Sequence, residues 1–322
     1  MQKISIVTAC YNEEENVAEL IEQVKTVMQK YDTRYSYEHI FIDNASTDKT
    51  VAILRNIAKN DKRIKIIVNS RNFGHIRSPM HALLQADGDA IISIVADLQD
   101  PPEMIINFIR QWEAGSDIVL AIKKSSEENK LMYKVREFYY SILYRLSEVP
   151  VYKNFTGFGL YDKKVMDAIR QMKDPYPFFR GMIAEVGYTV TKIPYDQPIR
   201  YKGITKNNFY TLYDMAILGI INNSKVPLRI ATFLSLIIGT VSFFIGLGYL
   251  IVKLFYWNQM SLGIAPLLIG ASFAFSILLF FIGILGEYIG MIYTQVLNRP
   301  LVFEKERINF DNNIKKDDNA NN

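Results

Sequence analysis

Polar side chains that could bind a metal ion and phosphates follow four short apolar runs in the N-terminal third of the chain. Tyr11, Asn12 and Glu13 follow the first run, Asp43 and Asn44 the second, Arg71 and Asn72 the third, and Asp97, Gln99 and Asp100 the fourth. Carboxylate and amide oxygens are the ligands that Mg²⁺ and Mn²⁺ prefer, and such an ion can bridge two phosphates. The set therefore indicates a site for a nucleotide diphosphate.

Some of these residues also have a simpler interpretation. Asn44, Ser46 and Asp48 in the segment DNASTDKT are typical helix-capping residues. Phosphate binding by a glycine-rich loop is not indicated, because the chain has neither a GxxxxGKS or GxxxxGKT segment nor a GxGxxG segment after its first apolar run. A metal ion and individual side chains are then expected to hold the phosphates.

The apolar runs alternate with segments of helical periodicity, and this order predicts the elements that position the polar residues. Strands are expected at residues 3–9, 37–43, 64–68, 90–96 and 117–122, and helices at 16–31, after Ser46, at 78–86 and from Pro101 onward. The alternation predicts an α/β fold with a doubly wound, mostly parallel sheet. Ligands bind at the carboxyl ends of the strands in such sheets, which is where the polar residues lie.

Two long uncharged segments predict a two-helix transmembrane hairpin. Residues 230–252 and 262–286 contain no charged side chain, whereas roughly 20 helical residues cross a bilayer core. The second helix is expected to extend to residue 289, and a pair of long helices in a soluble core is the alternative. Cations flank the hairpin at Lys225, Arg229, Arg299, Lys305 and Arg307. By the positive-inside rule, both ends of the hairpin are then cytoplasmic.

The remaining segments complete the predicted organisation. Residues 1–206 are expected to form a cytoplasmic domain, 207–229 an amphipathic juxtamembrane segment, and 308–322 a disordered tail. Residues 129–148 have an apolar helical face, which predicts either a helix in the membrane interface or an ordinary surface helix. The first apolar run is too short for a signal peptide. We therefore expect a multi-pass protein of the cytoplasmic membrane, with both termini cytoplasmic.

Charge and cysteine content exclude other classes of protein. The formal net charge is +4, and without a basic stripe the sequence indicates no nucleic-acid partner. The single cysteine, Cys10, excludes an internal disulfide and a cysteine-built zinc site. We expect it to be a small core residue at the end of a strand.

Five motifs, in this order and spacing, resemble one known family. The segments ACYNEEENV, FIDNASTDKT, SRNFGH and VADLQDPPE precede the two apolar segments, and ILGEYIG ends the second of them. This combination resembles the inverting family 2 glycosyltransferases that load a sugar onto polyprenyl phosphate, such as dolichol-phosphate mannose synthase and bacterial undecaprenyl-phosphate glucosyltransferases. The resemblance extends over the chain to about residue 307.

The resemblance implies a nucleotide-diphospho-sugar transferase type of domain and a role for each matching residue. Tyr11, Asn12, Glu13, Asp43, Asn44 and Arg71 would bind the nucleotide sugar, with Asp43 accepting from the base. Asp97 and Gln99 would ligate a divalent metal ion, Mg²⁺ or Mn²⁺, and Asp97 would be the catalytic residue. The cations Lys123, Arg200 and Lys206 would face the acceptor phosphate, although a solvated basic surface contains such cations as well. His75 could approach the diphosphate or be structural.

The resemblance also implies partners. The donor would be a nucleotide-diphosphate sugar, most simply a UDP-sugar, and the acceptor undecaprenyl phosphate, a polyprenyl phosphate lipid in the lipid bilayer. Relatives suggest a homo-oligomer such as a tetramer, and the segment GEYIG has the spacing of a weak helix-contact motif. A flippase and a downstream transferase would deliver the sugar to the cell surface.

Two departures from the family pattern bear on activity. Relatives have an aspartate where this chain has Val95, and many have an aspartate and an arginine at the positions of Gly157 and Gly159. The aspartate missing at position 157 has been regarded as a candidate base in relatives. A phosphate acceptor needs no base, however, because its second pKa of about 6 leaves it largely a dianion at neutral pH. Asp100 is expected to be able to replace the metal ligand missing at Val95.

Three functions remain open from the sequence. The first is sugar transfer from a UDP-sugar to undecaprenyl phosphate. The second is a processive polysaccharide synthase, which is disfavoured because the chain has no QxxRW segment. The third is a catalytically impaired membrane protein that keeps the fold and acts as a binding or partner module, as the substitutions at Val95 and Gly157 would permit.

Overall fold

The computed structural model describes residues 1–124, 152–198, 224–255 and 264–310. The expected interfacial helix at 129–148 lies outside these residues, as do Arg200, Lys206 and most of the juxtamembrane segment. The predictions that rest on them are therefore neither confirmed nor contradicted by the fold.

The sheet has eight strands in the described part of the chain, in the order β7-β5-β6-β4-β1-β2-β3-β8. They are β1 (Gln2–Cys10), β2 (Tyr35–Asp43), β3 (Ile64–Asn69), β4 (Ala90–Ser93), β5 (Ile118–Lys123), β6 (Phe155–Asp162), β7 (Val190–Tyr195) and β8 (Glu304–Ile308). β1 pairs in parallel with β2 and β4, β2 with β3, and β5 with β7. β6 runs antiparallel between β4 and β5, and β8 runs antiparallel to β3.

The predicted α/β sheet is confirmed, with three strands more than the sequence indicated. All five predicted strands are present, but β4 ends at Ser93 instead of continuing to residue 96. The added strands are β6, β7 and β8. They convert the mostly parallel sheet into a mixed one, because two of the three run antiparallel to their neighbours.

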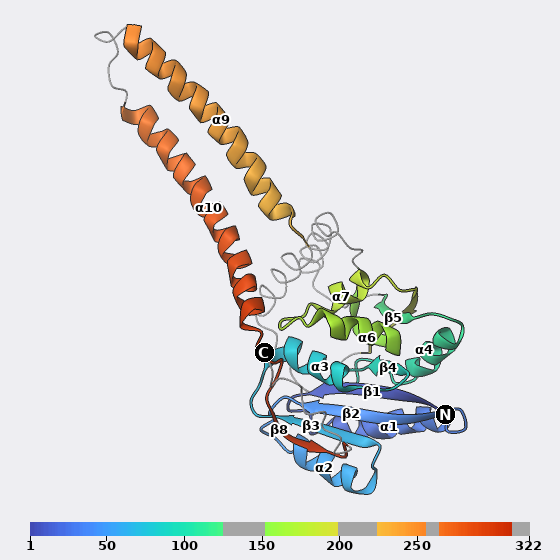
Figure 1. Cartoon of the computed structure of the whole chain (residues 1–322). Coiled ribbons are helices and arrows are strands. Elements are labelled where there is room, and N and C mark those ends of the chain that lie inside the picture. Colours follow the sequence, from blue (N-terminus) through green and yellow to red (C-terminus); the bar gives the residue numbers. More distant parts are fainter. Residues whose placement is uncertain (125–151, 199–223, 256–263, 311–322) are drawn as a thin grey trace, which may run out of the picture.

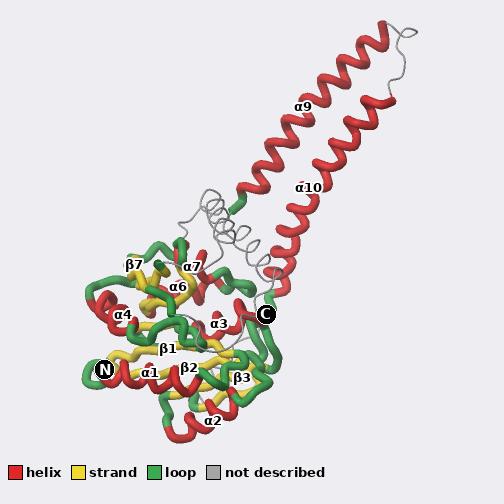
Figure 2. The backbone as a smooth tube through the Cα atoms, turned by 180° about the vertical axis from the view of Figure 1, so that it is seen from behind, coloured by secondary structure: helices red, strands yellow, loops and turns green. Residues whose placement is uncertain are grey.

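Helices cover both faces of the sheet, as the term doubly wound requires (Figures 1 and 2). They are α1 (Val17–Gln29), α2 (Thr50–Asn60), α3 (Gly74–Gln85), α4 (Met104–Glu113), α6 (Lys163–Met172) and α7 (Phe179–Glu185). One apolar cluster joins the sheet to α1, α2 and α4, and a second joins it to α3, α6 and α7. Each face of the sheet therefore has its own core.

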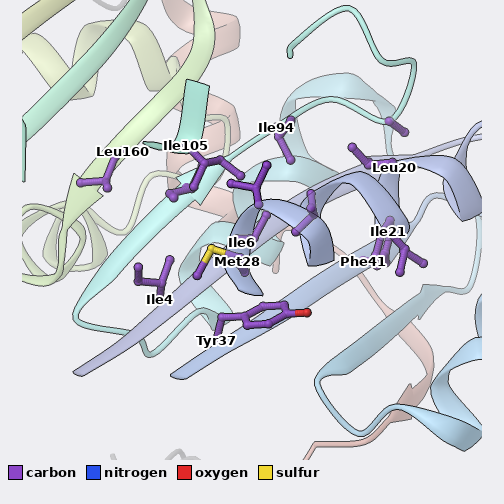
Figure 3. Packing of buried hydrophobic residues seen from close by; sticks show 14 of the residues in the cluster. Ile4, Ile6, Leu20, Ile21, Met28, Tyr37, Phe41, Ile94, Ile105 and Leu160 are labelled. Carbon is purple, nitrogen blue, oxygen red and sulfur yellow. The ribbon is translucent and has the colours of Figure 1, made fainter. Parts of the chain in front are cut away.

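The alternation of side chains along β1 explains this double core. Ile4 and Ile6 point to the face covered by α1, where they meet Leu20 and Met28 (Figure 3). Val7 belongs to the opposite cluster. Successive side chains of a strand point to opposite faces, so a strand that is apolar at nearly every position serves two layers of helices.

Two helix starts differ from the sequence prediction. α3 begins at Gly74, four residues before the expected start at 78, and α4 begins at Met104 instead of Pro101. Pro101 and Pro102 form a turn before α4, since Met104 N donates to Pro101 O at 3.0 Å and Ile105 N to Pro102 O at 3.0 Å. The double proline therefore precedes the helix and closes the end of the loop after β4.

The two long helices α9 (Val226–Phe255) and α10 (Ile264–Leu297) extend away from the sheet as a pair (Figure 1). Their apolar windows, 226–248 and 273–297, are long enough to cross a membrane and are not buried against the protein. Tyr288 Oη donates to Ser224 O at 2.6 Å and so joins α10 to the residues that begin α9. The structure thus contains the two apolar helices that the sequence predicts.

The chain returns to the sheet after α10, which the sequence did not indicate. β8 pairs with β3, and Asn309 Nδ2 donates to Ala58 O at 2.8 Å and to Ile64 O at 2.9 Å. Residues 308–310 were expected in a disordered tail and instead belong to the folded domain. The domain is therefore built from residues on both sides of the apolar helices, which ties α10 to the sheet.

Candidate active site

Four loops at the carboxyl ends of β1 to β4 form the candidate site, and each contains one residue with a positive φ. These residues are Asn12 (φ 55°), Ala45 (φ 63°), Gly74 (φ 85°) and Leu98 (φ 59°). The left-handed conformation is uncommon for residues other than glycine and persists only where neighbouring structure holds it. The sequence had placed its candidate residues in these same loops.

The loops after β1 and β2 are joined by hydrogen bonds between backbone and side chains. Asn12 N donates to Ser46 Oγ at 2.9 Å, and Thr47 N donates to Asn12 Oδ1 at 2.7 Å. Glu13 N donates to Thr50 Oγ1 at 2.9 Å. Two further bonds of this kind are Glu14 N to Asp48 Oδ2 (3.2 Å) and Lys49 N to Glu14 Oε2 (2.8 Å). The two loops therefore hold one another in place.

The buried side chain of Asp43 stabilises the loop after β2. Its side chain is fully buried, and its Oδ2 accepts a hydrogen bond from Ser46 N at 2.9 Å. Burial raises the pKa of Asp43, while the hydrogen bonds from Ser46 act in the opposite direction. Because the carboxylate has no exposed surface here, it acts in this structure as a support of the loop, and its expected contact with a nucleotide base stays a prediction.

Asn44 is also a support. Its Oδ1 accepts from Phe73 N at 2.8 Å and from Asn69 Nδ2 at 3.1 Å, and its Nδ2 donates to Asn72 Oδ1 at 2.8 Å and to Gly74 O at 3.1 Å. An asparagine side chain offers two donor hydrogens and two acceptor lone pairs. All four are used, so Asn44 joins the loops after β2 and β3 and has no group left for the ligand that the sequence assigned to it.

Other predicted nucleotide-binding residues remain accessible. Tyr11, Asn12 and Glu13 are partly exposed and Arg71 is exposed. The Arg71 guanidinium lies 4.1 Å from the centre of the Phe73 ring, which fixes its position above that loop. His75, also exposed, is the second residue of α3. These side chains form the surface on which a nucleotide would rest.

The loop after β4 presents Asp97 in a tight turn. Asp97 Oδ1 accepts a hydrogen bond from Gln99 N at 3.2 Å, which closes the turn around Leu98. Asp97 and Gln99 are both half-buried, and Val95 is 42% exposed. An apolar side chain this exposed at the loop is unusual for its type, and it marks the position where relatives have an aspartate.

Asp100 holds the loop after β4 and is not free to replace the missing metal ligand. The residue is 2% exposed, its Oδ2 accepts from Val95 N at 3.3 Å, and its Oδ1 accepts from Tyr195 Oη at 3.1 Å. Burial raises the pKa of Asp100 to about 6, and the nearby charge of Lys123 acts against this rise. The expectation that Asp100 substitutes for an aspartate at position 95 is therefore wrong.

Lys123 and Tyr195 complete this part of the site. Lys123 ends β5 and lies close enough to Asp100 to lower the pKa of that carboxyl, and the charge of Asp97 reaches the same group. The fold therefore brings Lys123 close to the loop that carries Asp97, and its expected contact with the acceptor phosphate stays a prediction. Tyr195 was not predicted from the sequence, because its contact with Asp100 depends on β7 pairing with β5.

Gly157 and Gly159 of β6 occupy the positions at which the family resemblance implied an aspartate and an arginine. Gly157 has φ 109°, a conformation that strains any other residue. A Cβ atom on Gly159 would lie 2.4 Å from Val119 O. Tyr161 Oη donates to Gly157 O at 2.7 Å and further fixes the strand. At Gly159, β6 therefore passes too close to β5 to carry a larger side chain. At Gly157 the limit is the φ angle alone, because a Cβ atom there would meet no atom within 4 Å.

The described residues were tested for the divalent ion that the sequence implies. They contain no group of three or more histidine, cysteine, aspartate or glutamate side chains that could hold a metal ion. Mg²⁺, however, is usually bound by one or two carboxylates together with water and substrate phosphates. The half-exposed carboxylate of Asp97 and the neighbouring Gln99 fit an ion that arrives on a diphosphate, and they do not form a dedicated metal cage.

Comparison with known proteins defines the class. Residues 5–172 match the family model for glycosyl transferase family 2. The chain is 34% identical over 300 residues to a Synechocystis protein named as an uncharacterised glycosyltransferase, covering 93% of both chains. It is 34% identical over 300 residues to the SfII prophage-derived bactoprenol glucosyl transferase of Shigella flexneri, covering 92% of this chain and 96% of that protein. An uncharacterised glycosyltransferase of Bacillus subtilis is 32% identical over 309 residues, covering 96% and 95%.

The chain belongs to glycosyl transferase family 2. It is a glycosyltransferase with a mixed α/β domain and two apolar helices that are long enough to span a membrane. The family resemblance seen in the five sequence motifs is thereby confirmed.

Proposed function

We propose that this protein transfers a sugar from a UDP-sugar to undecaprenyl phosphate at the cytoplasmic face of the membrane, with inversion at the anomeric carbon. One observation carries the proposal: the edge of the sheet formed by the carboxyl ends of its parallel strands lies near the C-terminal end of α10. Ser70 N, in the loop after β3, donates to Phe303 O at 2.8 Å, and α10 ends at Leu297. Six residues span at most about 20 Å, so a lipid phosphate beside α10 would lie near this edge.

The relatives support the acceptor. Those named bactoprenol glucosyl transferase match this chain over more than nine-tenths of its length, including both apolar helices. A lipid acceptor also explains why the apolar helices α9 and α10 lie within the sequence of the glycosyltransferase domain. The strands β1 to β7 precede them, and β8 follows them. The shared acceptor chemistry is a phosphate monoester on a polyprenyl chain.

In the proposed reaction the acceptor provides its own nucleophile. An oxygen of the phosphate dianion forms a bond to the anomeric carbon while the bond from that carbon to the nucleoside diphosphate breaks, and the electron pair leaves with the diphosphate. No proton needs to be removed, because the acceptor is already largely a dianion at neutral pH. This accounts for a site in which Gly157 replaces a candidate base.

The residues of the chain would divide the remaining tasks. Tyr11, Asn12, Glu13 and Arg71 would bind the nucleotide sugar on loops held by Asp43 and Asn44. Asp97 and Gln99 would hold a divalent ion together with diphosphate oxygens, and that ion would neutralise charge on the leaving diphosphate. Lys123, with Arg200 and Lys206, would hold the acceptor phosphate against the repulsion of the donor.

The membrane arrangement is part of the proposal. α9 and α10 would cross the cytoplasmic membrane as a hairpin, with the juxtamembrane residues 207–229 at the interface. The domain and both termini would then be cytoplasmic. A homo-oligomer, a flippase that turns the product outward and a downstream transferase for surface glycosylation would complete the pathway.

The test is a donor screen with the purified full-length protein. Labelled UDP-glucose, UDP-galactose, UDP-N-acetylglucosamine and GDP-mannose are each incubated with the protein, Mn²⁺ and undecaprenyl phosphate, and the label is extracted into organic solvent. We expect lipid-linked label with one UDP-sugar. Absence of such label with every donor would contradict the proposed reaction.

A second candidate function is a catalytically impaired binding module. The exposed Val95 and the glycine at position 157 favour it, because the family resemblance implies an aspartate at each of these positions. Calorimetry separates the two functions. Binding of UDP-sugar with Mn²⁺ but without turnover in the donor screen would support the binding module.

A further inference from the structure

A cavity of about 240 Å³ lies where α10 meets the domain, apart from the loops of the candidate active site. α3 and α6 form its apolar walls with Met80, Leu84 and Ile169, and α7 adds Met182. Its rim carries Lys173 and Arg299. The cavity therefore combines an apolar interior with a cationic rim at the point where the apolar helix ends.

Some charged side chains around the cavity have partners in the protein, whereas others form no ion pair with the described residues. Arg170 is occupied, since its Nε donates to Leu84 O at 3.1 Å and it pairs with Asp167. Asp174 Oδ1 already accepts from Gln295 Nε2 at 2.9 Å. Lys173 and Arg299 form no ion pair with any residue in the described ranges.

A further guanidinium adds to the excess of positive charge. Arg77 lies on α3, and its terminal nitrogen donates to Pro300 O at 2.7 Å, next to Arg299. Its Nε is buried and has no hydrogen-bond partner among the described residues. Burial lowers the pKa of Arg77, and the neighbouring charges of Arg71 and Arg299 act in the same direction. Apart from Arg170, which pairs with Asp167, the lining residues provide one carboxylate, that of Asp174, against the cations Lys173, Arg299 and the adjacent Arg77.

The partial negative charges at two helix ends offset only part of this positive charge. α6 ends at Met172, directly before Lys173, and α10 ends at Leu297, two residues before Arg299. The carboxyl end of a helix is equivalent to roughly half a negative charge. Two such ends and the carboxylate of Asp174 together offset about two of the three cations Lys173, Arg299 and Arg77. About one positive charge remains for a ligand.

We propose that this cavity binds the phosphodiester headgroup of an anionic lipid in the cytoplasmic leaflet, with Lys173 and Arg299 as its principal cations. The residues that line it from 298 to 301 follow the apolar window 273–297 directly, so the cavity lies at headgroup depth if α10 spans the membrane. The proposal rests on the membrane arrangement of the proposed function and not on its reaction.

The apolar lining favours a lipid over a free phosphate. Leu84 and Leu301 are only half-buried and can cover the glycerol backbone and the first methylenes of an acyl chain, whereas inorganic phosphate would leave them open to water. A bound lipid would contact α3, α6 and the exit of α10 together. It would therefore fix the orientation of the domain, and of its active-site edge, relative to the membrane.

The test compares lipid retention by variants of the full-length protein. The double variant K173Q/R299Q is purified in mild detergent with a fixed ratio of phosphatidylglycerol or phosphatidylcholine, and bound lipid is counted by native mass spectrometry. The control K30Q/K59Q removes the same charge from exposed positions at the ends of α1 and α2, of which α2 lies far from the hairpin (Figure 1). The variant K173R/R299K keeps both charges.

We expect K173Q/R299Q to retain roughly 25-fold less phosphatidylglycerol than the wild type, because each cation near an anionic headgroup is worth about a fivefold change in binding. The control and the charge-conserving variant should retain as much as the wild type, and phosphatidylcholine should be retained weakly by all. Equal phosphatidylglycerol retention by K173Q/R299Q and the wild type would overturn the proposal. Competition by millimolar glycerol phosphate would overturn the lipid as occupant. D97N should keep its lipid even if sugar transfer is lost, which separates this proposal from the proposed reaction.

Discussion

The two halves of the candidate active site are held in different ways. The loops after β1, β2 and β3 are joined to one another by a network of hydrogen bonds, in which Asn44 alone makes four. The loop after β4, which carries Asp97, is held by the Asp97 turn and by the single buried carboxylate of Asp100. The proposed nucleotide half, formed by the loops after β1, β2 and β3, is thus organised without a ligand, whereas the proposed catalytic half, the loop after β4, has few supports of its own.

This difference has a physical consequence for the reaction. A loop fixed in advance loses little conformational entropy when a nucleotide binds to it. Asp97 and Gln99, by contrast, offer too few ligands for a dedicated metal cage, so under the proposed function a diphosphate would bring the further oxygens that complete the coordination. Donor recognition and metal binding are therefore expected to be separable by mutation.

The largest effect on stability is expected from removing the side chain of Asn44, which joins the loops after β2 and β3. Asn44→Ala would delete four hydrogen bonds and leave Phe73 N buried without a partner, whereas Asn69 Nδ2 would keep its bond to Ser78 Oγ at 3.0 Å. At about 1 kcal/mol per bond, the loss of stability should be about 4 kcal/mol. Thermal unfolding followed by circular dichroism measures it, with Asn60→Ala at the exposed end of α2 as the control. A change under about 1 kcal/mol would show that the network does not organise these loops.

Gly159→Ala tests the close approach of β6 to β5. The new Cβ would lie 2.4 Å from Val119 O, which is backbone and cannot rotate away. We expect a loss of about 2 kcal/mol, as for other additions to a tightly packed interior, seen as a lower unfolding temperature. Gly115→Ala is a contrasting variant, because its Cβ would meet no atom within 4 Å and its cost would come from its φ of 100° alone. Wild-type stability of Gly159→Ala would show that β6 can move.

The pH dependence of stability tests the support of the catalytic half. The pKa of Asp100 is raised to about 6 by burial, against about 3.9 in an unfolded chain. The protonated form is therefore favoured by the fold, and its stabilising contribution is complete below pH 4 and is lost as the pH rises through 6. Between pH 7.5 and pH 5 the wild type should gain about 1.4 kcal/mol that Asp100→Asn does not. Parallel pH profiles of the two proteins would contradict this environment for Asp100.

The smallest effect is expected from restoring the family residue at position 95. Val95→Asp would place a third carboxylate on the loop that carries Asp97 and the buried Asp100, at a side chain that is already 42% exposed. We expect the Mn²⁺ concentration for half-maximal transfer to fall by up to about tenfold, with little change in the Michaelis constant for the donor. Val95→Asn, which adds no charge, is the matched control. An unchanged Mn²⁺ requirement would place residue 95 away from the ion.

The sequence predicted those parts of the fold that follow from local pattern. The strands β1 to β5 and the helix α1 were visible because their apolar residues recur at the period of a strand or a helix. β8 was missed because the segment EKERI is charged, and its identity as a strand depends on pairing with β3. The segment FTGFGLYD was recognised as a departure from the family, but its glycines concealed a strand.

The same distinction applies to the site. Asp97, Gln99 and Lys123 follow strands whose carboxyl ends meet at one edge, and their association was predictable from topology. The supporting roles of Asn44 and Asp100 were not predictable, because burial and hydrogen-bond partners depend on loops that are distant in the sequence. Sequence patterns identified the residues that gather at the edge, and the structure separates those that can contact a ligand from those that hold the loops.

The most direct test of this account is the transfer of labelled sugar to undecaprenyl phosphate by Asp97→Asn across a Mn²⁺ titration, with Glu14→Gln in the neighbouring loop as the control. The account predicts that Asp97→Asn folds like the wild type and binds UDP, yet transfers sugar at least about 100-fold more slowly at every Mn²⁺ concentration. Full turnover by Asp97→Asn would contradict the assignment of the loop after β4 as the catalytic half.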